Sequence, residues 1–322
     1  MAAAIHIEEL TKDYAVGFWR RRPYRALDRL TLTIPQSEVF GFLGPNGAGK
    51  TTTLKLLMQL IFPTAGRAEI LGRPVGDVAV RKRIGYLPEN PSFYDYLTAE
   101  ELLTYFAQLL DVPASDRGRR VSALLDRVGI GRERRFQLRK FSKGMIQRVG
   151  IAQALINEPE VVFLDEPMSG LDPVGRRDVR ALILELRDQG RTVFFSSHIL
   201  ADAEALCSRV AIVAGGRLAA SGRLDELSHF NARGWEVVVT NLAPSALDRM
   251  RPIASRVTEL GPGRYTVELP LSEAPERVIP DLASTGATVV SMQPVRETLE
   301  DFFMQRVAEA GGRAAEERDA RR

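Results

Sequence analysis

The stretch Gly44-Pro-Asn-Gly-Ala-Gly-Lys50-Thr51 decides the fold of this 322-residue chain. Two glycines stand five positions apart and are followed directly by Lys and Thr, which is the pattern of a phosphate-binding loop. Small residues allow successive backbone N–H groups to turn inward toward phosphate oxygens, and a helix that starts at the loop adds its dipole. An apolar run at 39–43 precedes the loop, and apolar residues with helical spacing follow over 51–61. We therefore expect a strand, a phosphate-binding loop and a helix in that order.

The residues of this loop have separable expected roles. Lys50 can reach the β- and γ-phosphates of a nucleotide, and the Thr51 hydroxyl can ligate Mg²⁺. A plain glycine turn is the alternative, but the flanking strand and helix argue against it. The residues predicted to bind the nucleotide here are Gly44, Asn46, Gly47, Ala48, Gly49, Lys50, Thr51 and Thr52.

Two acids end a second apolar run, Val161-Val-Phe-Leu-Asp165-Glu166. Because α/β sheets bind ligands at the carboxyl ends of their parallel strands, Asp165 is expected to hold Mg²⁺ through water. Glu166 is expected to orient or deprotonate an attacking water molecule. Two acids at a strand end are often a solvated loop, but the phosphate-binding loop in the same chain favours a site.

The order of the remaining patterns indicates how the chain is organised. Strands and helices alternate over 161–206, which predicts a parallel sheet covered by helices, whereas the pattern over 91–141 is helical, with breaks at Pro113 and at 129–131. From Trp235 to Met292 the order is β-α-β-β-α-β, the ferredoxin-like arrangement. We expect a nucleotide-binding domain at 1–228 with a helical subdomain at about 91–158, a C-terminal α+β domain at 231–310, and a disordered tail at 311–322.

Composition excludes several other classes of protein. Lys and Arg number 44 and Asp and Glu 41, so the net charge of +3 is too small to indicate nucleic-acid binding. No run approaches the 18 or so apolar residues of a membrane span, and the acidic start lacks the apolar core of a signal peptide. The single cysteine, Cys207, excludes an internal disulfide and is predicted to be a small core residue.

Over residues 4 to about 225 these motifs resemble, in their order, the nucleotide-binding subunit of an ATP-binding cassette (ABC) transporter. The resemblance implies a P-loop NTPase cassette, in which a RecA-like α/β core carries an antiparallel β subdomain and a helical subdomain. Ser142, Lys143 and Gly144 stand where the family has its signature motif, although Lys143 and Met145 depart from the usual glycine and glutamine. Because the family uses this motif in trans, the resemblance implies a head-to-tail dimer that encloses two ATP molecules.

Other site residues also follow from the resemblance. Ser169, Gly170 and Asp172 resemble the D-loop, and His198 resembles the switch histidine that contacts the γ-phosphate. With Glu166 and Lys50, His198 completes the expected catalytic set. Tyr14 stands where the family stacks an aromatic ring on adenine, with Phe18 and Trp19 as nearby alternatives, and Glu89 stands where it more often has a glutamine that touches Mg²⁺.

The resemblance predicts an ATP- and Mg²⁺-dependent ATPase subunit of an exporter whose membrane permease is a separate polypeptide. Its partners would be that permease and a second copy of itself or a homologous subunit, at the cytoplasmic face of the membrane, with no nucleic acid. The alternative is a non-transport ABC ATPase that acts on the ribosome or DNA. The single cassette and the gap of 142 − 89 = 53 residues between Glu89 and Ser142, without sustained heptads, argue against it.

Overall fold

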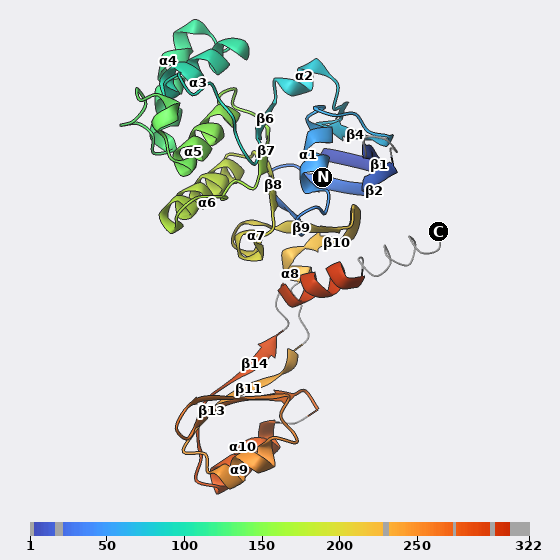
Figure 1. The fold of residues 1–322 in the computed structure, drawn as a ribbon, viewed down its shortest axis with the longest axis vertical. Coiled ribbons are helices and arrows are strands. Elements are labelled where there is room, and N and C mark those ends of the chain that lie inside the picture. Colours follow the sequence, from blue (N-terminus) through green and yellow to red (C-terminus); the bar gives the residue numbers. More distant parts are fainter. Residues whose placement is uncertain (1–2, 17–21, 228–231, 273–274, 297–299, 310–322) are drawn as a thin grey trace. The chain divides into compact units, whose positions relative to one another are not determined.

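The computed structural model describes residues 3–16, 22–227, 232–272, 275–296 and 300–309. Contacts divide the chain into two compact units, which Figure 1 colours along the sequence. The first unit comprises Met1–Leu224 and Phe303–Arg322, and the second comprises Asp225–Phe302. The phosphate-binding loop and all the predicted site residues belong to the first unit.

A mixed sheet forms the centre of the first unit, in the order β10-β9-β3-β8-β7-β6. The five strands from β9 to β6 are parallel to one another, and β10 pairs antiparallel at one edge, which confirms the predicted parallel sheet. Phe194 lies at the centre of this core, stacked on Phe40 and in tilted contact with Phe42 and Phe163, and all four rings are buried. The strands are β3 (Val39–Leu43), β6 (Ile84–Leu87), β7 (Val161–Asp165), β8 (Thr192–Ser197), β9 (Arg209–Ala214) and β10 (Arg217–Arg223).

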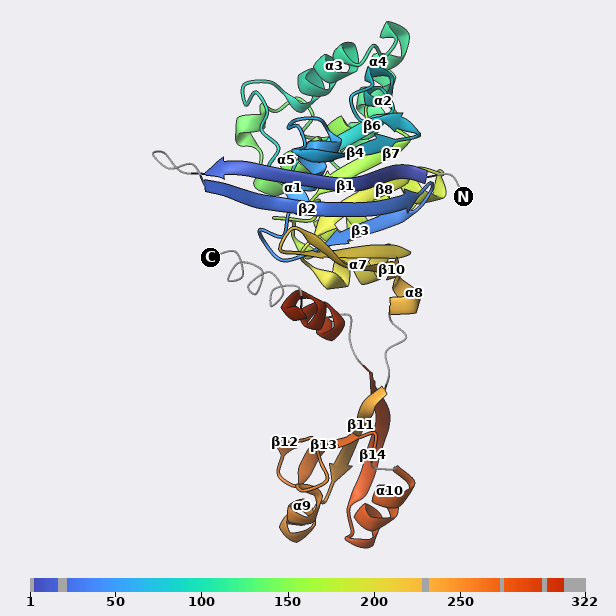
Figure 2. The same ribbon diagram turned by 90° about the vertical axis from the view of Figure 1, so that its right-hand side faces the viewer.

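A second, antiparallel sheet has the order β2-β1-β4-β5 and confirms the expected β subdomain. Its strands are β1 (Ala3–Val16), β2 (Arg22–Pro35), β4 (Ala65–Ile70) and β5 (Arg73–Pro74). Figure 2 shows β1 and β2 side by side as one long hairpin, longer at both ends than the apolar–polar alternation of the sequence at 4–10 and 26–34. Their pairing shifts register at several points, which interrupts this alternation along the strands.

Helix α1 (Lys50–Leu57) starts at the phosphate-binding loop as predicted, but it ends four residues earlier than the apolar pattern suggested. Gln59 has a positive φ of 54°, which no right-handed helix accommodates, and Leu60 is 60% exposed. The apolar residues after Leu57 therefore belong to a turn and not to the helix.

The helical insert confirms the helices predicted between β6 and β7. It contains α3 (Ala99–Leu109), α4 (Ala114–Arg127), the 3-10 turn Leu138–Lys140 and α5 (Lys143–Ala154), with α2 (Val78–Arg81) ahead of β6. Thr98 and Glu101 form a reciprocal capping box at the start of α3, and the Ser142 hydroxyl accepts a hydrogen bond from the Met145 N–H at the start of α5.

Three further helices complete the fold around the core: α6 (Pro173–Asp188), α7 (Leu200–Leu206) and α8 (Leu224–Leu227). Cys207 caps α7 and is buried, as predicted for a small core residue. Among the residues that the structure describes, no helix is long and apolar enough to cross a membrane.

The second unit is a four-stranded antiparallel sheet in the order β12-β13-β11-β14, with two helices. Its elements follow the predicted order β-α-β-β-α-β: β11 (Ala232–Thr240), α9 (Pro244–Met250), β12 (Arg256–Gly261), β13 (Arg264–Pro270), α10 (Pro275–Ser284) and β14 (Thr288–Arg296). Residues 300–309 form a further helix, and Phe303 and the residues after it group with the first unit. The expected domain bounds of 1–228 and 231–310 remain a prediction, and the tail at 311–322 lies outside the described residues.

Candidate functional site

An open cavity of about 440 Å³ collects most of the predicted nucleotide-binding residues. It lies where the phosphate-binding loop, the hairpin β1–β2 and the carboxyl end of the central sheet meet. Its lining includes Tyr24 and Ala26, which the sequence analysis did not single out. The predicted residues that line it are Tyr14, Asn46, Gly47, Ala48, Gly49, Lys50, Thr51, Thr52, Glu89, Glu166, Ser169 and His198.

Close packing explains why the loop needs glycine at two of its positions. A Cβ on Gly44 would lie 2.4 Å from the Val213 carbonyl oxygen, and one on Gly49 would lie 2.8 Å from the Ala26 carbonyl oxygen. Gly49 also has a φ of +106°, a conformation that residues with a side chain rarely adopt. These two glycines let the loop lie against β9 and β2, so its backbone turns back toward the cavity.

Lys50 is buried at the start of α1 and folds back over the loop. Its Nζ donates to the Gly44 carbonyl oxygen at 2.7 Å and lies 3.6 Å from Glu166 Oε1. A buried ammonium held mainly by a neutral carbonyl can exchange this partner for an anion that enters the cavity. Lys50 is thus placed to meet the phosphates.

Asp165 lies at the end of β7 and is completely buried. Its Oδ1 accepts a hydrogen bond from Ser196 Oγ at 2.5 Å, whereas Oδ2 has no partner among the described residues. Burial raises the pKa of Asp165 above its usual value and the Glu89 and Glu166 carboxylates raise it further, against the opposing effect of the Ser196 and Thr51 hydroxyls. An unsatisfied carboxylate oxygen beside a hydroxyl suits a hard cation such as Mg²⁺.

Glu166 and His198 form a hydrogen-bonded pair at the rim of the cavity. His198 Nδ1 lies 2.9 Å from Glu166 Oε2, and the Ser196 hydroxyl accepts a hydrogen bond from the Glu166 N–H. Glu166 has a φ of +49°, a left-handed conformation that is costly for a residue with a long side chain. The strained residue is thus Glu166 itself, which is predicted from the sequence to orient or deprotonate the attacking water.

Glu89 lines the same cavity, close to the strand-end acids. Burial, followed by the Asp165 and Glu89 carboxylates, raises the pKa of Tyr86 to about 12, because an ionised phenol would face two negative charges. The Glu89 and Glu166 carboxylates thus both act on the buried Asp165, and negative charge gathers at this end of the sheet. No group of three or more His, Cys, Asp or Glu side chains in the described ranges could hold a metal ion alone, so a cation here would also need ligands such as phosphate or water.

Tyr14 lies in the cavity as predicted, near the end of β1. It is paired across the hairpin with Tyr24 on β2, and Lys12 Nζ lies 5.3 Å from the centre of its ring. Tyr24 was not predicted from the sequence, because it follows a basic segment without strand alternation. The alternatives Phe18 and Trp19 lie outside the described residues.

The signature residues do not join this cavity. Ser142, Lys143 and Gly144 line a separate open cavity of about 610 Å³, together with Gly170 and Asp172 from the D-loop. Only Ser169 of the three D-loop residues lines the nucleotide cavity. Asp172 also caps α6, since its Oδ1 accepts a hydrogen bond from the Gly175 N–H at 2.8 Å. Within one chain, the motif that the family applies to ATP thus faces a different opening from the phosphate-binding loop.

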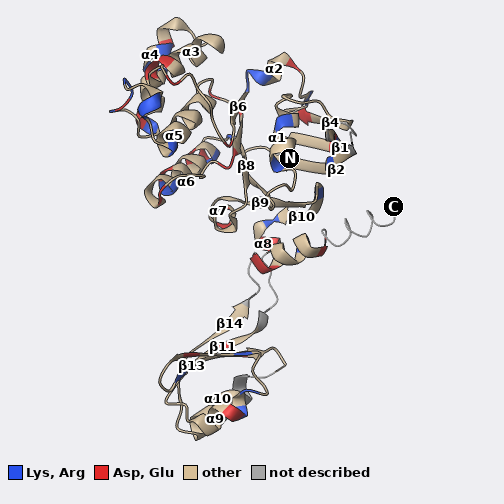
Figure 3. Cartoon of the chain, in the orientation of Figure 1, with Lys and Arg blue, Asp and Glu red and all other residues tan. Residues whose placement is uncertain are grey.

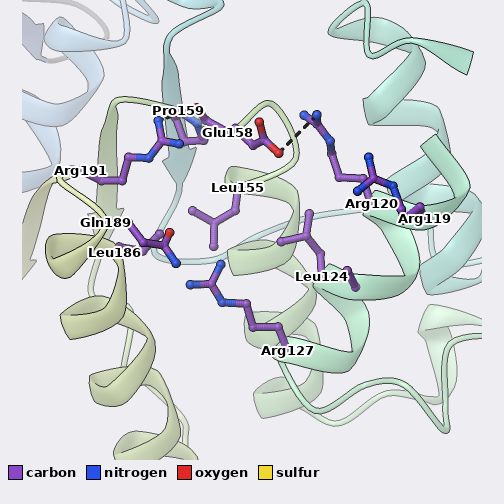
Figure 4. Close-up of a pocket in the computed structure, with 11 residues that line it drawn as sticks. Arg119, Arg120, Leu124, Arg127, Leu155, Glu158, Pro159, Leu186, Gln189 and Arg191 are labelled. Atoms are coloured by element: carbon purple, nitrogen blue, oxygen red, sulfur yellow. Dashed lines mark hydrogen bonds and ion pairs between the residues drawn. The ribbon is translucent and has the colours of Figure 1, made fainter. Parts of the chain in front are cut away.

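A further cavity of about 280 Å³ lies between α4, the turn after α5 and the end of α6. Figure 4 shows Leu124 and Leu155 pointing toward one another across it, with arginines around the rim. Arg120 pairs with Glu158 at 3.3 Å and Arg127 with Glu185 at 2.9 Å, so these rim charges are largely neutralised. Figure 3 likewise shows basic and acidic residues interspersed along α4 and α6, as expected for a solvated surface.

Comparisons with known proteins agree with this geometry. Residues 27–169 match the family model described as ABC transporter. An uncharacterized ABC transporter ATP-binding protein of Synechocystis sp. is 46% identical over 312 residues, which cover 96% of this chain and 86% of that protein.

Two further relatives have names that include a transported compound. The bacitracin transport ATP-binding protein BcrA of Bacillus licheniformis is 38% identical over 236 residues, 72% of this chain and 74% of BcrA. A fluoroquinolones export ATP-binding protein of Mycobacterium tuberculosis is 40% identical over 210 residues, 65% of this chain and 68% of that protein.

A solved structure gives the same fold. It is the dimeric, post-hydrolysis state of an ATP-binding cassette bound to ADP and Pi, with a TM-score of 0.63 and 25% identity, and it matches 68% of this chain and 98% of the cassette. Together with the 46% identity along nearly the whole sequence, this places the first unit among ATP-hydrolysing cassettes. The chain belongs to the family of ABC transporter ATP-binding proteins, the ATPase subunits of these transporters.

Proposed function

We propose that two cassettes close head-to-tail around two ATP molecules and that their hydrolysis drives a separate membrane permease in the direction of export. One observation carries the proposal: the phosphate-binding loop, Glu166 and His198 share one cavity, while Ser142 and Gly144 face another. Two openings on one chain suit a dimer in which each site takes a loop from one subunit and a signature motif from the other.

In this proposal the residues of the nucleotide cavity have different roles in hydrolysis. The loop amides and Lys50 bind the phosphates, and Lys50 leaves the Gly44 carbonyl oxygen to do so. Glu166 accepts the proton of the attacking water, and His198 fixes the orientation of that carboxylate through Oε2. The His198 side chain is 49% exposed and lines the cavity, where it can reach the γ-phosphate.

The residues fit a magnesium ion, because the buried Oδ2 of Asp165 has no hydrogen-bond partner among the described residues and Thr51 and Glu89 supply further oxygen ligands. Mg²⁺ held by these residues would neutralise charge on the phosphates during transfer. Glu89 would add a negative charge where the family more often has a neutral amide.

Two substitutions test the catalytic assignment. Glu166→Gln should abolish hydrolysis, retain ATP binding and trap the closed dimer, measured by phosphate release and by size-exclusion chromatography with ATP. Lys50→Ala should weaken nucleotide binding itself. Hydrolysis at the wild-type rate by Glu166→Gln would refute the proposed base, and unchanged affinity in Lys50→Ala would refute the role of the loop.

A mixing experiment tests the head-to-tail arrangement. Lys50→Ala and Ser142→Glu should each be inactive alone, because one lacks the loop cation and the other places a carboxylate against phosphate. Random pairing makes about half of the dimers mixed, and each mixed dimer keeps one intact site, so activity should recover to about a quarter of wild type. No recovery on mixing would indicate that loop and signature act within the same chain.

The permease is proposed to dock on an aromatic surface that follows Glu89. Tyr94, Tyr96 and Tyr105 are 59%, 60% and 48% exposed, and the rings of Tyr94 and Tyr96 contact each other with centroids 5.8 Å apart. Clustered exposed aromatic rings are typical of a surface that a partner covers. In this arrangement the subunit lies peripherally at the cytoplasmic face of the membrane.

Membrane association can be measured directly. A tagged chain should sediment with membranes and co-purify with a protein of several spans. The double variant Tyr94→Ser and Tyr96→Ser should lose this co-purification but still bind ATP. Sedimentation with ribosomes would instead support the non-transport alternative. The name of the fluoroquinolone relative states export and that of the bacitracin relative states transport, and inverted vesicles supplied with ATP and either compound test the direction.

A further inference from the structure

Two tyrosines face the nucleotide cavity from opposite strands of the long hairpin. Tyr14 on β1 and Tyr24 on β2 are direct partners in the antiparallel register. Directly opposed residues of an antiparallel pair place their side chains on the same face of the sheet, with Cβ atoms about 4.5–5.5 Å apart. Both side chains line the cavity, and Tyr24 is 46% exposed. A large aromatic ring is thus left uncovered beside the phosphate-binding loop.

The adjoining part of the hairpin holds this pair in place. The next pair along the register is Asp13 with Arg25, whose guanidinium donates to both carboxylate oxygens at 2.8 and 3.1 Å. The register then skips Ala26, which forms a bulge and also lines the cavity. Bulges beside binding sites re-aim neighbouring side chains. The bidentate ion pair and the bulge together fix which face of β2 carries Tyr24.

The geometry of the pair limits what it can bind. Two rings whose Cβ atoms are about 5 Å apart cannot take a flat base between them, but side by side they form a broad surface for stacking. A purine, with two fused rings, is wide enough to cover both tyrosines, whereas a pyrimidine covers one. We propose that Tyr24 and Tyr14 form a two-ring platform for the base and that this platform makes the site select purine over pyrimidine nucleotides.

This inference rests on the proposed nucleotide-binding function and adds a specificity residue to it. Tyr14 alone would stack either kind of base, because every base has a π-face. Tyr24 supplies the additional area that only the larger base uses. The phosphate contacts lie at the loop and are independent of Tyr24.

Isothermal titration of the purified full chain with four stable probes tests the platform: ADP, GDP, CDP and inorganic pyrophosphate. Wild type should bind ADP and GDP more tightly than CDP. Tyr24→Ala should raise the Kd for ADP and GDP about 5- to 10-fold, as expected for lost base stacking, with little change for CDP and none for pyrophosphate. Tyr24→Phe should behave as wild type because it keeps the ring, and Phe136→Ala is a control for an exposed aromatic ring outside the cavity.

The outcomes separate this inference from the function on which it rests. If ADP binding requires Lys50 but the ratio of ADP to CDP affinity is unchanged in Tyr24→Ala, the platform is refuted and the nucleotide site stands. If wild type binds none of the four probes, the proposed function itself is refuted. Should Tyr24→Ala fail to fold by circular dichroism, Tyr24→Leu retains apolar bulk without a ring and must show the same loss of purine preference.

Discussion

Replacing Asp165 by Asn is expected to stabilise the nucleotide-free protein while removing its magnesium-dependent activity. Asp165 is fully buried, and its Oδ2 has no hydrogen-bond partner among the described residues. Leaving a buried polar group without its partner costs about 1–3 kcal/mol, and more when the group is charged. Asn has nearly the same shape and its side-chain oxygen can still accept from Ser196, but it brings no charge into the core.

The expected gain is smaller than the whole cost, because the Asn amide would also lack one partner. We expect about 1–2 kcal/mol, and since 1 kcal/mol shifts Tm by about 2–4 °C in a domain of this size, a rise of about 2–8 °C. The gain should depend on pH. Burial raises the pKa of Asp165 above its usual 3.8, so in the window just above 3.8 the native state binds more protons than the unfolded state. Wild-type stability therefore falls as pH rises through that window.

A second buried carboxylate provides a matched control with the opposite sign. Asp202 on α7 is 1% exposed, and its Oδ1 accepts a hydrogen bond from Arg180 on α6 at 2.5 Å. Asp202→Asn leaves the guanidinium without its charge partner, which should cost about 1–3 kcal/mol. Two Asp→Asn changes in the same unit should thus move Tm in opposite directions.

Thermal unfolding in EDTA, followed by circular dichroism from about pH 4 to pH 8, measures both effects. The advantage of Asp165→Asn should vanish near the usual carboxyl pKa and be fully present at neutral pH. Phosphate release with Mg²⁺ and ATP then reports the loss of activity. A lower Tm for Asp165→Asn at neutral pH, or a gain that does not change with pH, would show that the buried charge is compensated in the apo protein.

Three further predictions concern parts of the chain away from the reacting atoms. Because burial raises the pKa of the Cys207 thiol, the folded protein should not react with Ellman's reagent at pH 8, and one thiol should react in guanidinium. The exposed pair Arg127–Glu185 should contribute less than about 1 kcal/mol in a double-mutant cycle of urea unfolding, in contrast to Asp202. Replacing Asp225–Phe302 by a glycine-serine linker should retain ATPase activity within about twofold, because the cavity residues lie in the first unit; loss of activity in a folded protein would assign the second unit a role in turnover.

Where local sequence fixes local geometry, the prediction from sequence was accurate. The conformation of the loop from Gly44 to Thr51 is determined by residues within the loop, since Gly49 permits a positive φ and Lys50 begins a helix. Polar and apolar residues do not alternate in β7 and β8. Such continuous apolar runs indicate strands that are buried on both faces, as both strands are.

Elements that depend on distant partners were missed or misjudged. Strand β6 has only four residues, includes Gly85, and becomes a strand because it pairs with β7 at the edge of the sheet. Gly85 is required there since a Cβ would lie 1.9 Å from the Ala154 carbonyl oxygen, a contact with α5 that lies far away in the sequence. The apolar residues after Leu57 were assigned to the helix because periodicity cannot show that Gln59 turns the chain.

The same distinction between local and distant causes explains why Tyr14 was found and Tyr24 was not. Tyr14 follows a recognisable strand, whereas the place of Tyr24 depends on a register that shifts between Lys12 and Asp13 and leaves Ala26 without a partner. A regular ladder would have opposed Asp13 to Ala26 and Tyr14 to Arg25, and the ring of Tyr24 would have had no aromatic partner across the strand. One bulged residue therefore converts a charged segment of β2 into one wall of the nucleotide cavity, and the purine preference proposed above depends directly on it.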